Sequence, residues 1–124
     1  MDTHAFLWWV TDDLRLSERA RSIVEDVRND VYFSAVSAFE IAIKAQIGRL
    51  AFRESPELFV TRQLATNNFR QLPITVRHGL NVFSLPPIHR DPFDRLLVAQ
   101  ALGEDLVLLS DDHFIAQYDV PVTW

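Results

Sequence analysis

The chain contains no cysteine among its 124 residues. Disulfide bonds and thiolate metal sites are therefore excluded, and any metal ion has to be bound by oxygen or imidazole ligands. No apolar stretch approaches the roughly 20 residues that a membrane-spanning helix needs, and the short apolar run at 5–10 lacks the basic leader of a signal peptide. These absences predict a cytoplasmic protein with no membrane partner.

Positive charge is also scarce. Twelve basic residues, of which Lys44 is the only lysine, stand against 17 acidic ones and give a net charge of −5. Proteins that bind nucleic acid by neutralising phosphates are usually basic, so this balance argues against a passive nucleic-acid-binding protein. A hydrophobic content of 48% with 23% charged residues is typical of a soluble globular fold and excludes a disordered chain.

Apolar periodicity and capping signals predict helices and strands that alternate along the chain. We expect helices at 3–10, 18–29, 37–47, 56–66, 75–83 and 92–102, and strands at 31–36, 69–74, 106–109 and 120–123. Ser55-Pro56 and Asp91-Pro92 each combine an N-cap with a proline at the first helical position, and Gly48 is expected to end the third helix. The alternation predicts one α/β domain over residues 1–124, a three-layer sandwich with a mostly parallel central sheet flanked by helices.

Several carboxylates fall where an expected strand ends or the following helix begins. They are Asp2, Glu40, Asp94 and the neighbours Asp111 and Asp112. Each acid taken singly has a structural explanation, as a helix cap, a turn residue, a favourable charge on a helix dipole or an i,i+4 ion pair. Ligands of parallel α/β folds bind beyond the carboxyl ends of the strands, however, and all these acids map to that edge. Their shared location favours a joint functional role.

Carboxylates that converge on one point repel one another unless a cation lies between them. A site made of oxygen ligands suits Mg²⁺ or Mn²⁺. Ions held by carboxylates lower the pKa of a bound water and stabilise both oxygens of an in-line phosphoryl displacement. The residues alone therefore predict a phosphate-ester site with Mg²⁺ or Mn²⁺ as its cofactor.

Four segments around these acids resemble the PIN domain, specifically the VapC-type toxin ribonucleases of bacterial toxin–antitoxin pairs. The segments are Asp2–Trp9, Ser34–Lys44 followed by Gly48 and Leu50, His89–Ala101, and Leu108–Asp112. The last one resembles a Thr/Ser-x-Asp element, which puts Asp112 rather than Asp111 at the fourth acidic position. The resemblance implies that Asp2, Glu40, Asp94 and Asp112 are the catalytic and metal-binding residues.

The resemblance also implies a Mg²⁺- or Mn²⁺-dependent endoribonuclease that cuts cellular RNA. A cognate antitoxin protein that inhibits the enzyme and a homodimeric state are implied with it. In that family a short hydrophobic strand in the middle of the sheet precedes the first acid, whereas here only Met1 precedes Asp2. We therefore expect a truncated first strand, with three explanations: the sequence is trimmed, its start is misassigned, or Asp2 is less firmly held than in relatives.

Three more residues near the motifs are candidates for a supporting role or for substrate contact. Ser110 either orients Asp112 by a hydrogen bond or only forms a turn. Arg95 contacts a substrate phosphate or an antitoxin carboxylate, or else it is a solvated helix residue paired with Asp91. Asp111 lies beside the fourth acid and is the third candidate.

Two other functions remain open from the residues alone. A phosphatase-type phosphoryl-transfer enzyme usually carries a second acid two residues after the first, and here that position is His4. A non-catalytic binding domain with PIN architecture is expected to lose some of its acids, and here the set is complete. His4 and His89 show no ligand spacing with another histidine, so we expect structural or supporting roles for both.

Overall fold

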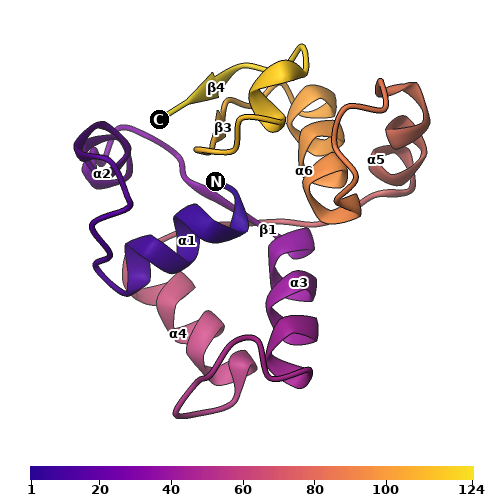
Figure 1. Ribbon diagram of the computed structural model, residues 1–124. Helices are drawn as coiled ribbons and strands as arrows, with labels where there is room; N and C mark the ends of the chain where they lie inside the picture. The colour runs from indigo at the N-terminus through magenta and orange to yellow at the C-terminus, as the bar shows by residue number, and fades with distance from the viewer.

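The computed structural model describes residues 1–124 as a mixed arrangement of helices and short strands (Figure 1). The α-helices are α1 (Thr3–Val10), α2 (Glu18–Glu25), α3 (Ala35–Gln46), α4 (Pro56–Asn67), α5 (Val76–Asn81) and α6 (Pro92–Gly103). Two short 3-10 helices follow α5 and β3, namely η1 (Val82–Ser84) and η2 (Ile115–Gln117). The strands are β1 (Tyr32–Ser34), β2 (Arg70–Leu72), β3 (Leu108–Leu109) and β4 (Val122–Thr123). None of the helices is long and apolar enough to cross a membrane.

The strands pair in parallel, as predicted, but they form two small sheets instead of one continuous ladder. β1 pairs with β2, and β3 pairs with β4. The first two residues lie between the sheets, because the Met1 amino group donates to the Tyr32 carbonyl at 3.3 Å and the Asp2 N–H donates to the Leu109 carbonyl at 2.9 Å. Met1 and Asp2 therefore connect β1 to β3, but only through these two hydrogen bonds.

A cleft of about 280 Å³ lies between the β1–β2 sheet and the β3–β4 sheet, and Met1 is one of the residues that line it. Its wall is mostly apolar and includes Val31 and Tyr32 on one side and Leu106 to Leu109 on the other. None of the acids singled out in the sequence lines it. The cleft is thus separate from the edge at which the acids gather.

Two hydrophobic cores lie on either side of this boundary. The N-terminal core joins α1, β1, α3 and α4 through Phe6, Phe33, Ile41, Val60, Leu64 and Phe69. The C-terminal core joins α6, β3 and η2 through Val98, Ala101, Leu108, Ile115, Tyr118 and Val120. A smaller cluster of Ala5, Leu16, Ala20 and Leu109 packs α1 and α2 against β3. Helix α1 therefore contributes to the packing on both sides.

Most predicted elements are present, but several are shorter than expected, among them all four strands. The helix expected at 18–29 ends at Glu25, where the chain turns at Asp26. The strand expected at 31–36 ends at Ser34, because the Ser34 side chain accepts from the Val36 N–H and starts α3. Ser37, expected to open that helix, is instead fully buried inside it. This earlier start moves Glu40 from the first turn of α3 toward its middle.

Candidate active site

Asp2 is the N-cap of α1 and only 5% exposed. Its Oδ1 accepts from the Ala5 N–H at 2.7 Å, and its Oδ2 accepts from the Ser110 hydroxyl. The same Ser110 oxygen accepts from the Asp112 N–H at 3.1 Å. Ser110 therefore holds the Asp2 carboxylate and the Asp112 backbone together, which is a wider role than the one predicted from its position.

Glu40 is buried in α3 and has two partners. The Thr3 hydroxyl donates to its Oε1 at 2.7 Å and also lies 2.9 Å from the Ser37 hydroxyl. The Lys44 ammonium pairs with its Oε2, which is the i,i+4 ion pair expected from the sequence. The negative charge of Glu40 is thus compensated inside the protein, although its side chain is only 3% exposed.

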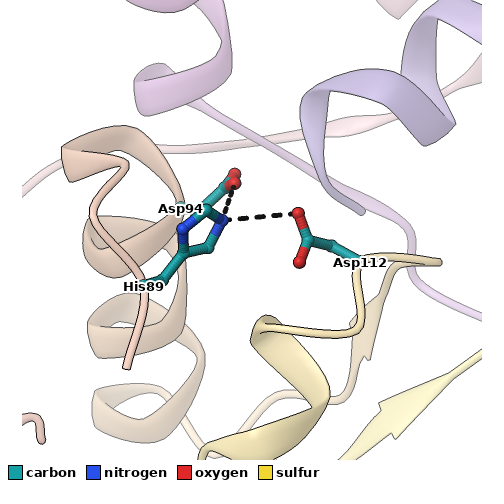
Figure 2. Close-up of side chains that lie close together, drawn as sticks. All are labelled: His89, Asp94 and Asp112. Carbon is teal, nitrogen blue, oxygen red and sulfur yellow. Dashed lines mark ion pairs between the residues drawn. The ribbon is translucent and has the colours of Figure 1, made fainter. Parts of the chain in front are cut away.

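Asp94 and Asp112 face each other across the ring of His89 (Figure 2). Asp94 comes from the first turn of α6, while Asp112 follows β3 and accepts from the Phe114 N–H at 2.8 Å, just before η2. The His89 Nε2 atom lies 2.9 Å from Asp94 Oδ2 and 3.4 Å from Asp112 Oδ2. One ligand atom from each of the three residues lies within 4.8 Å of the others.

This site carries an excess of negative charge. The pKa of Asp94 is raised to about 7, first by burial and then by the charges of Asp91, Asp112 and Asp2, while His89 opposes the rise. Burial also raises the pKa of Asp2 against the hydrogen bonds from Ser110 and Ala5. A cation that binds between such carboxyls favours their ionised form, so that their protons are released to solvent.

The two nitrogens of His89 have different surroundings. Nδ1 accepts from the Asp91 N–H at 3.3 Å, so in the neutral ring the proton belongs on Nε2. Nε2 is buried between the two carboxylates, and the ring geometry gives it no aligned hydrogen bond despite the short distances. His89 thus directs an N–H toward the acids in the absence of a cation.

The donor set fits a divalent cation. Carboxylate oxygens from Asp94 and Asp112 converge, Asp2 contributes a third charge, and a buried polar atom of His89 lies unsatisfied among them. Hard oxygen ligands of this kind are the ones that Mg²⁺ and Mn²⁺ prefer. Glu40 does not share a point of convergence with Asp94 and Asp112 and is held by Thr3 and Lys44 instead.

Two candidates from the sequence lie outside the cluster. Asp111 is exposed, and Asp112 takes the place in the cluster. The Arg95 guanidinium donates to the carbonyls of Pro86 at 2.9 Å and Val82 at 3.3 Å and to the Tyr118 hydroxyl at 3.1 Å. These bonds tie the segment before α6 to the helix, so the guanidinium is engaged in structure, and the predicted pairing with Asp91 is absent.

His89 and Thr3 are the site residues that the sequence reasoning underestimated or missed. His89 lies two residues before the N-cap Asp91 of the helix that carries Asp94, and this position was the available signal. Thr3 follows Asp2 directly, but its bond to Glu40 spans 37 residues along the chain. Such a pairing depends on how α1 packs on α3, which no local pattern reveals.

Comparisons with known proteins agree with this arrangement. The profile of the PIN domain family matches residues 1–121. The chain is 30% identical over 122 residues to Ribonuclease VapC22 of Mycobacterium tuberculosis (strain ATCC 25618 / H37Rv), an alignment that covers 98% of this chain and 92% of that protein. Both similarities span the elements that carry all four predicted acids. The chain therefore belongs to the PIN domain family.

Proposed function

We propose that the protein is a metal-dependent endoribonuclease that hydrolyses phosphodiester bonds in cellular RNA. The observation that carries this proposal is the convergence of Asp94, Asp112 and His89 in a half-buried acidic site, where the pKa of Asp94 is raised to about 7. The 30% identity to a ribonuclease supports the choice of RNA as substrate. We assign Mg²⁺ or Mn²⁺ as the cofactor.

Asp94 and Asp112 would hold the cation in this proposal, and Asp2 would supply a third negative charge beside it. Glu40 acts from α3 through water, since its own oxygens are bonded to Thr3 and Lys44. Ser110 keeps Asp2 in place while it fixes the backbone of Asp112. A divalent cation held by these carboxylates would supply the activation of a water molecule and the neutralisation of charge on the phosphate.

The side chains of this protein then have two tasks during hydrolysis. The carboxylates of Asp94 and Asp112 must be ionised, and a pKa near 7 at Asp94 means that it releases its proton near neutral pH when a cation arrives. The His89 Nε2 atom lies close to both carboxylates, and His89 opposes the rise in the pKa of Asp94 before that event. The Lys44 ammonium pairs with the Glu40 carboxylate in its buried position.

A cleavage assay with a mixed RNA pool tests the proposal. The wild-type protein is expected to cut RNA with Mg²⁺ or Mn²⁺ and to stop when EDTA is added. Asp94→Ala should abolish cleavage while the far-UV circular dichroism spectrum stays unchanged, whereas the exposed control Asp119→Asn should cut normally. An active Asp94→Ala protein, or cleavage that survives EDTA, would contradict the mechanism.

The same assay separates the other candidate functions. Hydrolysis of a small phosphomonoester such as p-nitrophenyl phosphate without cleavage of RNA would identify a phosphatase-type enzyme instead. RNA binding without cleavage under any divalent ion would identify a non-catalytic binding domain. The complete set of buried or half-buried acids favours the nuclease over both.

We also propose that the enzyme is the toxin of a toxin–antitoxin pair, that it acts in the cytoplasm as a homodimer, and that a cognate antitoxin protein inhibits it. The resemblance of the four acidic segments to VapC-type toxins supports this part. Induction of the wild-type protein should arrest growth, and induction of Asp94→Ala should not. Co-expression of a small protein encoded beside it should restore growth and co-purify with the chain.

For the fold, we propose that residues 1–124 form one three-layer domain whose central sheet has a truncated first strand. The cleft of about 280 Å³ between β1 and β3 supports this interpretation, since it lies where a strand entering Asp2 would pair with both neighbours. Met1 and Asp2 already bond to the two strands. A backbone segment in that cleft would join both sheets in the order β2-β1-first strand-β3-β4, with every pair parallel.

A further inference from the structure

Phenylalanines flank three of the four acids of the candidate active site. Phe39 precedes Glu40, Phe93 precedes Asp94, and Phe114 follows Asp112 by two residues. Phe39 is 58% exposed and Phe114 is 40% exposed, while Phe93 is half-buried. Exposed aromatic rings usually signal a contact surface, because their apolar area is left in water in the free protein.

Phe39 and Phe93 form one of two aromatic surfaces beside the acids. Their ring centroids are 5.7 Å apart with planes inclined by 66°, an edge-to-face pair between the N-terminal halves of α3 and α6. Figure 1 shows that these two helix ends are neighbours. The pair fixes Phe93, and the face of Phe39 that remains in solvent is available to a ligand.

Phe114 forms the second surface. Its ring lies 4.9 Å from the ring of His89, inclined by 34°, and its N–H donates to the Asp112 carboxylate at 2.8 Å. The ring therefore rests on the histidine that contacts both Asp94 and Asp112. The adjacent His113 ring, 4.2 Å away, widens the surface.

The charge of the molecule makes these rings important for RNA. The site contains Asp2, Asp91, Asp94 and Asp112, and the whole chain has a net charge of −5. An RNA phosphate is repelled by such a surface, and the bound cation compensates only for the phosphate that reacts. Affinity for the neighbouring nucleotides then has to come from their bases, and bases stack on aromatic side chains whatever their sequence.

Resting on the proposed ribonuclease function, we propose that Phe39 with Phe93 on one side, and Phe114 on the other, are stacking surfaces for unpaired bases next to the phosphate that is cut. Only nucleotides that are free of a duplex expose the faces that these rings need. The rings therefore select single-stranded segments or loops. Because stacking involves few phosphates, the dependence of binding on salt is expected to be shallow.

The test measures binding in an Asp94→Asn background, in which cleavage is absent, with Mg²⁺ present. The probe is a fluorescein-labelled 12-nucleotide RNA without secondary structure, followed by anisotropy, with a duplex of the same sequence for comparison. Phe39→Ala and Phe114→Ala should each raise Kd for the single strand about tenfold or more. Phe39→Trp should retain the affinity, and Phe83→Ala, which removes a ring that is 96% exposed on η1, should leave it unchanged.

Two further measurements separate this inference from the proposed function. In the protein that retains Asp94, Phe39→Ala should raise KM with little change in kcat. The affinity of the proposed metal site for Mn²⁺ should be unchanged. Equal RNA affinity in all phenylalanine variants would overturn the stacking inference, while cleavage by the wild-type protein would still support the nuclease. Loss of affinity in Phe39→Ala with no cleavage by the wild-type protein would support stacking and refute the nuclease.

Discussion

The raised pKa of Asp94 predicts that the metal-free protein loses stability as the pH rises toward neutrality. The folded protein holds a proton on Asp94 up to about pH 7, whereas the unfolded chain releases it near 3.8. Between these values the folded state binds more protons, so the free energy of unfolding falls as the pH increases. Replacing Asp94 with asparagine removes the buried charge and should remove this loss.

The size of the effect follows from the shift. A difference of about three pKa units corresponds to about 4 kcal/mol at pH 8, which is a ceiling for a side chain that is 17% exposed. Asp94→Asn should therefore match the wild type near pH 4 and exceed it by up to about 4 kcal/mol at pH 8. For a domain of this length that is a rise in Tm on the order of 10 °C.

Urea denaturation followed by circular dichroism at pH 4.5, 6 and 8 in EDTA measures this difference. Asp119→Asn is the matched control, because it removes an exposed aspartate and should keep the pH dependence of the wild type. Adding Mn²⁺ at pH 8 should narrow the difference, since only the wild type is expected to bind the cation tightly. If the free energy of unfolding changed equally with pH in the wild type and in Asp94→Asn in EDTA, the raised pKa of Asp94 would be refuted.

Three other measurements follow from the same contacts. Ser110→Ala leaves the Asp2 carboxylate and the Asp112 N–H without their shared partner and should lower the free energy of unfolding by about 1–3 kcal/mol in urea. Arg95→Met should speed amide hydrogen exchange before α6, because the loop carbonyls and the Tyr118 hydroxyl lose their donor, while the Kd for Mn²⁺ stays unchanged. Mn²⁺ at a hundred times its Kd should stabilise the wild type by about 2.7 kcal/mol, and a melting temperature that does not respond would argue against a cation site.

Local signals predicted the starts and ends of several helices. Ser55-Pro56 and Asp91-Pro92 open α4 and α6 as expected, because a capping side chain and a proline act within one turn. Gly48 follows the end of α3 with a φ of +78°, a conformation that favours glycine. These features depend on neighbouring residues only, so the sequence displays them directly.

Strand lengths and long-range contacts were not predictable in the same way. Ser37 was expected to open α3, but Ser34 is its N-cap. The earlier start of the helix shortens β1. The continuous apolar run at 106–109 predicted a longer strand than β3, which pairs over two residues only. Pairing depends on which neighbour strand is present, and an apolar pattern carries no information about that.

In the candidate active site, the expected ends of the strands predicted where the acids lie. They did not predict which residues contact these acids. Asp94 and Asp112 meet because α6 packs beside β3 in the C-terminal core. His89 joins them through the turn at Asp91, whose N–H orients the ring. Arg95 illustrates the reverse case, since a basic residue beside an acidic motif suggested substrate contact and its neighbours in space turned out to be carbonyls.

The position of the acids between two separate cores has a consequence for cooperativity. Glu40 belongs to the N-terminal core, Asp94 and Asp112 belong to the C-terminal core, and Asp2 connects the two through Ser110. Without a cation, the acids repel one another across this boundary, and we expect this repulsion to favour separate opening of the two halves. A cation held from both sides would couple the two openings, so that amide exchange in one half would slow together with exchange in the other. The candidate active site would then also make the unfolding of the two halves cooperative.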